Sequence, residues 1–500
     1  MNTGSILKKL TGETAVYGLS SIVGRFLNWL LVPVYTRVLP ETSDYGIVTN
    51  LYGWTALFLV ILTYGMETGL FRFISREEDK KGVYGTILTA LAVTSTAFAL
   101  LVLIFIKPIA SAMNYAGHWN LVCMLAVIVA MDAFTSLPFA YLRYEQRPLR
   151  FAAIKLISIA INIGLNLFFL IGAPFLAGRG FNAVRLIWNE NRDMIDYIFI
   201  TNVVSSLFAL IALAPSYLFK WRFDAKLFKL IFGYSFPILL FGIAGIFNQT
   251  ADKILFPYIF SDKAEANSQL GIYGACFKIA VVMVMALQAF RYAYEPFIFK
   301  YKKGDDTSIY AVVTHYFIIF SMTVFLAVTL YLDIFKHFIS EKYYSGLAVV
   351  PIVLLGEFFY GIYSNLSIWY KLTDRTRWGT YFSVIACAVT VLVIILFVPG
   401  YGFIACAWAS FFSNLIIMVL SYIFGQKYFP IAYRIAPAAL NSAAAVAIFF
   451  ISSFFTSRLP MPEKLALNTC LMALYLIFIA LSDADIRRFI FRKLKIRGGN

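Results

Sequence analysis

The 500-residue sequence has few charged residues, few histidines and few cysteines. Asp, Glu, Lys and Arg make up 14 % of the chain, whereas an average soluble domain has about 25 %. Residues of the set AVILMFWYC make up 61 %, which is more than a soluble core of this size can bury. A soluble enzyme, a disordered chain and a secreted disulfide scaffold are therefore poor interpretations, and the composition is typical of a protein that crosses a membrane many times.

The sequence motifs of common enzymes are also missing. There is no GxGxxG or Walker A phosphate loop, no HExxH and no GxSxG, and the three histidines lie far apart. The five cysteines lie in apolar runs, and no two of them have CxxC spacing, so neither a metal site nor a disulfide framework is indicated. The first 13 residues lack the apolar core of a signal peptide, so we expect no cleavable signal. We expect no catalytic residues, no metal ligands, no cofactor and no enzymatic activity.

What the sequence has in abundance is long apolar runs. A helix needs about 20 mostly apolar residues to cross the hydrocarbon core. We identify fourteen such runs, near 13–38, 45–71, 83–106, 120–142, 151–173, 195–219, 228–257, 268–294, 308–331, 346–370, 378–398, 402–425, 434–456 and 465–482. The connections between them are short, and none can hold a soluble domain. The predicted fold class is an all-α integral membrane protein with about 14 transmembrane helices.

The basic residues are divided unevenly between the two sets of connections. With an even number of spans, both termini lie on one side, and that side carries 27 Lys and Arg against 10 on the other. The positive-inside rule then places both termini in the cytoplasm. The net charge of +16 needs no nucleic-acid partner, because topology accounts for it. The basic tail at 483–500 is interleaved with apolar residues and is expected to lie on the anionic inner leaflet.

The two halves of the chain resemble each other. The spacing from Tyr17 to Pro40 recurs from Tyr234 to Pro257, and a Gly-Ile pair opens both run 2 and run 8. Because six spans form each copy, the copies enter the membrane from the same side and form a parallel repeat about an axis along the membrane normal. The predicted domains are an N-lobe at 1–222 (spans 1–6), a C-lobe at 223–427 (spans 7–12), spans 13 and 14 at 428–482, and the tail at 483–500.

Charged residues inside the spans are the candidate functional residues. Each costs roughly 2.5–3.5 kcal/mol at a helix centre, so each should face the protein interior or a wet cavity. Among the deeper ones, the cations are Arg25, Lys253 and Lys278, and the carboxylates are Asp132, Asp252 and Glu357. Their charges cancel. The cations either bind an anionic substrate or are neutralised by the carboxylates.

Polar residues also form stripes at helical spacing. Run 1 carries Tyr17, Ser21, Arg25, Asn28 and Tyr35 on one face, and run 5 carries Lys155, Ser158, Asn162 and Asn166. Stripes on several helices favour a hydrated cavity between the lobes. The alternative is that polar side chains hold neighbouring helices together.

The segments at 14–25, 31–39, 44–46 and 64–73 carry a family resemblance; the last reads Tyr-Gly-Met-Glu-Thr-Gly-Leu-Phe-Arg-Phe. They resemble bacterial polysaccharide flippases, of which the O-antigen (Wzx-type) flippases are the best-known branch. These belong to the multidrug/oligosaccharidyl-lipid/polysaccharide exporter superfamily. The resemblance implies a V-shaped pair of six-helix lobes and alternating access. It also implies that a lipid-linked oligosaccharide diphosphate is moved from the inner to the outer leaflet.

The resemblance implies a role for one of the charged residues, and the position of the others in the spans makes them further candidates. Arg25 matches a first-helix arginine that contacts the diphosphate in related flippases. The substrate-binding candidates are Arg25, Asn28, Lys155, Lys253 and Lys278. The candidates for coupling transport to Na+ or H+ are Asp132, Asp252 and Glu357.

The resulting expectation is a flippase of the bacterial inner membrane that translocates undecaprenyl-diphosphate-linked oligosaccharide repeat units for cell-surface polysaccharide, such as lipopolysaccharide O-antigen. Its expected partners are that substrate, membrane lipids, and the polysaccharide polymerase and chain-length proteins. One alternative is a multidrug cation antiporter of the same fold, which would favour acidic cavity residues. The other is a membrane sugar polymerase or ligase, which would need a large outer loop with catalytic groups.

Overall fold

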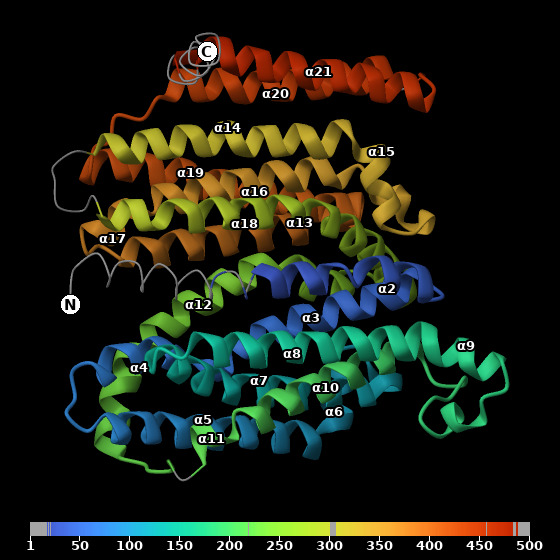
Figure 1. Ribbon diagram of the computed structural model, residues 1–500, viewed down its shortest axis with the longest axis vertical. Coiled ribbons are helices and arrows are strands. Elements are labelled where there is room, and N and C mark those ends of the chain that lie inside the picture. The colour runs from blue at the N-terminus through green and yellow to red at the C-terminus, as the bar shows by residue number, and fades with distance from the viewer. Residues whose placement is uncertain are drawn as a thin grey trace, which may run out of the picture. The chain divides into compact units, whose positions relative to one another are not determined.

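The computed structural model describes residues 18, 20, 22–218, 220–300, 307–456, 458–483 and 487–488, with side chains only up to residue 291 in the segment that ends at 300. Every regular element in these residues is a helix (Figure 1). Because a helix satisfies its backbone hydrogen bonds internally, it can cross the hydrocarbon without unpaired polar groups. The all-α class expected from the composition is thereby confirmed.

Thirteen stretches of the described residues are long and apolar enough to cross a membrane. They are α3–α4 (Thr42–Ile74), α5 (Lys80–Ile104), η1–α7 (Ala116–Tyr144), α8–α9 (Pro148–Gly178), α10 (Met194–Ala212), α12 (Ala225–Ile259), α13 (Lys263–Arg291), α14 (Ser308–Leu330), α16–α17 (Val349–Leu372), α18 (Arg377–Tyr401), α19 (Phe403–Tyr428), α20 (Ile435–Thr456) and α21 (Met461–Ser482). They correspond to predicted runs 2 to 14. Run 1 begins outside the described residues, and its described part holds a helical stretch at 22–29 and α2 (Val32–Val38). The chain is a multi-pass membrane protein.

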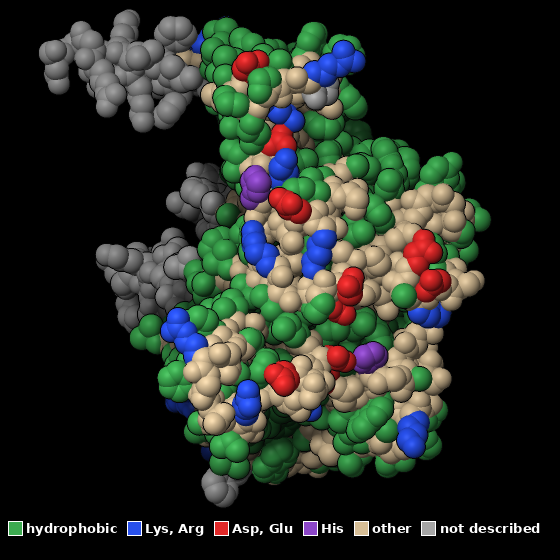
Figure 2. Space-filling model, turned by 90° about the vertical axis from the view of Figure 1, so that its right-hand side faces the viewer, with side chains coloured by type: hydrophobic (Ala, Val, Ile, Leu, Met, Phe, Trp, Pro, Cys, Tyr) green, Lys and Arg blue, Asp and Glu red, His purple; other side chains and the backbone are tan. Residues whose placement is uncertain are grey.

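Short helical elements fill several of the connections. They are α6 (Ile106–Ala112), η3 (Asn182–Leu186), α11 (Ala214–Tyr217), α15 (Leu332–Phe335), η4 (Lys336–Phe338) and η5 (Glu341–Gly346). Figure 2 looks onto the helix ends that lie at the right of Figure 1. Charged side chains of both signs stand there among uncharged polar groups and backbone, and hydrophobic side chains dominate the margins. This distribution suits helix ends that meet water and helix flanks that meet lipid.

The described residues fall into two compact units. The first consists of Met1–Ala275 with Cys387–Cys406, and the second of Cys276–Ala386 with Ala407–Asn500. The lobe boundaries at 222 and 427 stay a prediction.

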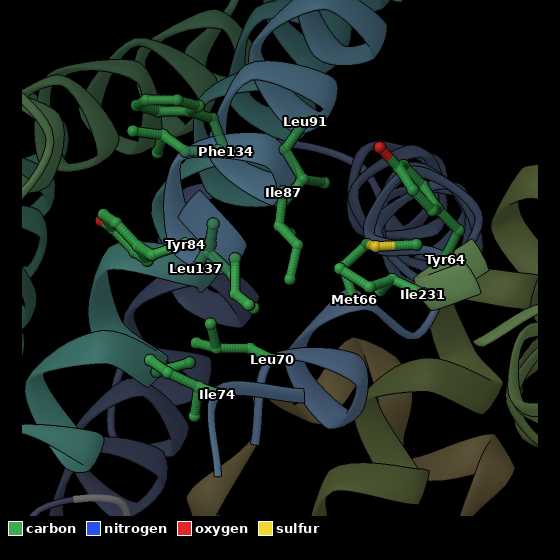
Figure 3. Packing of buried hydrophobic residues seen from close by; sticks show 13 residues of the cluster. Tyr64, Met66, Leu70, Ile74, Tyr84, Ile87, Leu91, Phe134, Leu137 and Ile231 are labelled. Carbon is green, nitrogen blue, oxygen red and sulfur yellow. The ribbon is translucent and has the colours of Figure 1, made fainter. Parts of the chain in front are cut away.

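In the first unit, α7 packs against α3, α5 and α10, while α8 packs against α10 and α12 against α3 (Figure 1). A buried apolar cluster joins α4, α5, α7 and α12 through Leu70, Ile87, Leu137 and Ile231 (Figure 3). This packing fixes the helices on which the charged side chains of the unit stand.

The second span of the chain is interrupted between its two helices, α3 and α4. α3 (Thr42–Thr63) ends at Tyr64, whose φ is 30°, and the next residue, Gly65, has a φ of 71°. Two left-handed residues in succession interrupt the helical hydrogen bonds, and α4 (Met66–Ile74) starts directly after them. Glu67, in the first turn of α4, is therefore positioned by this break.

In the second unit, α14 packs against α16, α20 and α21. Buried polar contacts attach α21 to α14 near both ends of these helices. His315 Nε2 lies 2.7 Å from Asp483 Oδ2, and Asn468 Nδ2 donates to the Leu330 carbonyl over 2.6 Å. The last span is therefore held to α14 by specific hydrogen bonds as well as by packing.

Candidate functional site

Arg25 lies on the first span, close to α8. The neighbouring residue, Gly24, is in tight contact with α8, since an added Cβ would lie 2.6 Å from Ile159 Cδ1. The side chains of Arg25 and Asn28 are both exposed. The stripe partners Tyr17 and Ser21 lie outside the described residues.

Lys155 stands on α8, one helical turn before Ile159. It lies within electrostatic range of Arg25 and of three other charged residues. Its side chain is exposed, and its ammonium lies 5.5 Å from the centre of the Phe139 ring. Four charged residues are near enough to act on it electrostatically. They are Asp132 and Arg143 on α7, Arg25 on the first span, and Glu67 on α4. We call these five residues the charge cluster.

The members of the charge cluster are paired unequally. Arg143 forms an ion pair with Glu67, and Asp132 lies within electrostatic range of Lys155. Within the described residues, neither Arg25 nor Lys155 has a carboxylate within 4.0 Å. The alternative in which a carboxylate neutralises Arg25 through an ion pair is therefore not seen among the described residues. With three cations against two carboxylates, the cluster keeps an excess positive charge and two cations that can receive an anion.

The polar stripes of runs 1 and 5 have two different roles. Tyr35 donates to Asn166 Oδ1 over 3.0 Å, and Asn166 donates to Thr201 Oγ1 over 2.7 Å. Asn162 and Asn202 continue this network on α8 and α10. Here the polar side chains join helices, as the alternative interpretation of the stripes proposed. At the other end of the same stripes, Arg25, Asn28 and Lys155 are exposed.

Lys253 and Asp252 on α12 form an ion pair with each other. Lys253 Nζ lies 3.0 Å from both carboxylate oxygens of Asp252, and the Tyr273 hydroxyl donates to Asp252 Oδ2 over 2.6 Å. The side chain of Asp252 is only 2 % exposed and that of Lys253 is 16 % exposed. The charge of Lys253 is thus compensated by an adjacent buried carboxylate, and removing either partner would leave a buried charge unpaired.

Lys278 on α13 and Glu357 on α16 belong to the second unit and are half-buried there. The five residues predicted to bind substrate are thus divided between an exposed group (Arg25, Asn28 and Lys155), the compensated Lys253, and Lys278 in the other unit.

Sequence reasoning missed Arg143. It also linked Glu67 to no other charged residue. The available signal was that runs 2 and 4 both end on the predicted cytoplasmic side, so their terminal charges lie at the same depth. That two such helices are also neighbours is a tertiary fact.

The chain matches the family described as "Polysaccharide biosynthesis protein" over residues 34–293, more than half of its length. Glu67, Asp132, Arg143 and Lys155 lie within the matched range, and Arg25 precedes it. The comparison with curated proteins gave no match.

Several solved structures are similar to this chain. A structure of lipid II flippase MurJ in an inward closed conformation matches with a TM-score of 0.69 and 15 % identity, over 94 % of this chain and 99 % of that one. An inward-facing multidrug resistance MATE family transporter of the MOP superfamily has a TM-score of 0.61 at 11 % identity, over 81 % and 94 % of the two chains. The MATE multidrug transporter DinF-BH has a TM-score of 0.60 at 14 % identity, over 85 % and 97 %.

At these identities the structural likeness shows a common fold, and fold alone does not assign a substrate. The family match is independent of that likeness and covers most of the first unit, including four of the five members of the charge cluster. The chain therefore belongs to the polysaccharide biosynthesis protein family and has the fold shared by MurJ and the MATE transporters.

Proposed function

We propose that this protein is a flippase that moves a lipid-linked oligosaccharide diphosphate across the bacterial inner membrane by alternating access. The observation that carries the proposal is the pair of exposed cations, Lys155 on the membrane-spanning helix α8 and Arg25 on the predicted first span, neither with a carboxylate within 4.0 Å among the described residues. A cation without an ion-pair partner in a membrane span is costly, which favours a role in binding. A diphosphate would supply the missing negative charge.

The chemistry of the three exposed side chains suits such a head group. The guanidinium of Arg25 can hold phosphate oxygens through paired hydrogen bonds, and the ammonium of Lys155 adds a point charge. The amide of Asn28 can both donate and accept hydrogen bonds, as sugar hydroxyls require. Translocation needs no covalent step, so we propose a transporter without enzymatic activity.

Membership of the polysaccharide biosynthesis family and the fold shared with a lipid II flippase support a lipid-linked substrate. We propose an undecaprenyl-diphosphate-linked repeat unit of a cell-surface polysaccharide, with O-antigen as the leading case. Both termini would face the cytoplasm, and polymerase and chain-length proteins would act on the product at the outer leaflet. The carboxylate of Asp132, beside Lys155, is our candidate for coupling to Na+ or H+; Asp252 and Glu357 remain further candidates.

The second candidate function is export of organic cations, because the fold is also that of MATE multidrug transporters. The excess positive charge of the charge cluster disfavours it, since like charges repel a cationic substrate.

Reconstitution of the purified full chain into proteoliposomes tests the two functions together. One assay follows the appearance of an undecaprenyl-diphosphate-linked oligosaccharide in the opposite leaflet, using an impermeant lectin. The other follows the movement of a fluorescent organic cation. We expect oligosaccharide translocation above protein-free liposomes and no cation movement. Cation movement without oligosaccharide translocation would overturn the proposal.

A further inference from the structure

We propose that Arg143 is a further phosphate-binding residue, and that Glu67 occupies its guanidinium as an internal competitor when no substrate is bound. This inference rests on the proposed function, because it concerns the same diphosphate. It adds a residue that the sequence did not single out, and it gives the Glu67–Arg143 ion pair a role in transport.

The hydrogen bonds of Arg143 are incomplete. One terminal nitrogen of its guanidinium binds a carboxylate oxygen of Glu67. Its Nε is buried and has no hydrogen-bond partner among the described residues. An arginine offers five N–H donors in a planar fork, and a buried donor without a partner is uncommon in native structures. The unused donor shows that Glu67 alone does not satisfy this guanidinium.

The position of Arg143 connects it to the two available cations. Lys155 is within the electrostatic range of both Arg143 and Arg25. A diphosphate bound at Lys155 would therefore lie in the field of all three cations, and its several oxygens could engage donors that a single carboxylate leaves free. This gives the diphosphate an advantage over Glu67 in competing for Arg143.

The exposure of the Glu67–Arg143 pair allows a diphosphate to replace Glu67 at the Arg143 guanidinium. The side chains of Glu67 and Arg143 are 46 % and 34 % exposed, so packed protein does not enclose the pair and a displaced Glu67 carboxylate has room to move. The Asp252–Lys253 pair provides the contrast, since Asp252 is 2 % exposed and also accepts from Tyr273. Breaking a buried ion pair is strongly unfavourable, whereas a partly exposed pair contributes less stability. Of the two, only the Glu67–Arg143 pair is suited to open during a transport cycle.

Displacement of Glu67 from Arg143 would also loosen the attachment of α4, the helix that carries Glu67. Glu67 stands in the first turn of this helix, directly after the left-handed residues Tyr64 and Gly65, and the Arg143 guanidinium lies 5.4 Å from the centre of the Phe71 ring on the same helix. Displacement of Glu67 would remove the ion pair between α4 and α7. Binding of the diphosphate would therefore release one attachment of a helix that already follows a backbone break.

The test measures binding of undecaprenyl diphosphate, without a sugar, to the full chain in nanodiscs of neutral lipid, with undecaprenol as the uncharged control. We expect Glu67→Gln to lower the Kd by about two- to fivefold, because the competing carboxylate is gone. We expect Arg143→Gln to raise the Kd by about tenfold. In the Arg143→Gln background, Glu67→Gln should have no further effect, since the two residues act on one guanidinium.

Arg222→Gln is the matched control, because Arg222 forms an ion pair with Asp79 at 2.6 Å, also between segments of the first unit. It should bind as the wild type does. If Arg143→Gln fails to fold, Arg143→Lys, which keeps the charge and loses the fork, should bind more weakly than the wild type.

The outcomes separate this inference from the proposed function. If Arg25→Gln weakens binding while the Arg143 and Glu67 variants bind as the wild type does, the inference is wrong and the proposed function stands. If the wild type binds undecaprenyl diphosphate no better than undecaprenol, both are overturned.

Discussion

Gly46 and Gly271 lie at a helix crossing in which each glycine meets the backbone of the other helix. A Cβ on Gly46 would lie 1.8 Å from the carbonyl oxygen of Asn267, and one on Gly271 would lie 1.9 Å from that of Thr42. Asn267 lies four positions before Gly271, and Thr42 lies four positions before Gly46. The contact is therefore reciprocal, as a local twofold relation between two copies requires. The same two glycines open runs 2 and 8 of the predicted repeat.

This crossing predicts that Gly46→Ala destabilises the protein. An added methyl group has no room beside a backbone carbonyl, and overpacking costs about 1–3 kcal/mol or more. The thermal midpoint of the detergent-solubilised protein measures the effect. Gly245→Ala on α12 is the control, because no atom lies within 4 Å of its added Cβ, and it should be neutral or stabilising. Equal midpoints for Gly46→Ala and Gly245→Ala would contradict the close crossing.

The second prediction concerns the hydrogen bonds between the first span, α8 and α10. Asn166→Leu leaves the hydroxyls of Tyr35 and Thr201 without their amide partner, and such interhelical bonds are worth about 0.5–2 kcal/mol in a membrane. We expect a lower thermal midpoint. Asn28→Leu, at an exposed position of the same stripes, should melt as the wild type does. A stability change at Asn28 and none at Asn166 would reverse the assignment of structural and binding residues along the stripes.

The third prediction is a pH dependence at the attachment of α21. Partial burial alone would raise the pKa of the Asp333 carboxyl, but hydrogen bonds from Lys336 and Lys464, together with their charges, outweigh it and hold that pKa below its usual range. Because the folded-state pKa is lowered, the stabilisation is complete above the unfolded value of about 4 and is lost as the pH falls through the folded value.

Comparison of the wild type with Asp333→Asn isolates this contribution from other carboxylates. At pH 7 the variant should melt about 1–3 °C lower. As the pH falls below about 4 and through the lowered folded-state value, the two thermal midpoints should converge, because the wild-type carboxyl then becomes protonated in the folded protein. A difference that is the same at pH 7 and pH 3 would show that the carboxylate charge is not what holds Lys464.

The spans could be predicted from the sequence because the bilayer leaves few alternatives to a long apolar helix. Run 308–331 and α14 (Ser308–Leu330) differ by one residue at one end. What could not be predicted is irregularity inside a run. The sequence marks Gly65 as permissive, but nothing in it shows that Tyr64 also adopts a left-handed conformation. Likewise, the π-helical turn at Phe168–Gly172 lies inside an uninterrupted apolar run.

The candidate site was predicted in part for a related reason. Helical periodicity shows which residues share a face, and so it grouped Lys155 with Asn162 and Asn166. It does not show what that face meets. Asn166 meets Tyr35, which is 131 positions away in sequence, whereas Lys155 meets the other charges of the cluster. Arg143 was missed because its significance depends on the proximity of α4 and α7, which composition and spacing do not encode.

The most direct test of the account is the rate at which Arg25 variants translocate an undecaprenyl-diphosphate-linked oligosaccharide in proteoliposomes that contain equal amounts of folded protein. If Arg25 holds the diphosphate through paired hydrogen bonds, Arg25→Lys should slow translocation by about tenfold, and Arg25→Ala should abolish it. Both variants should reach the membrane at the wild-type level. Translocation at the wild-type rate by Arg25→Ala would contradict the account, because it would remove Arg25 from the substrate site.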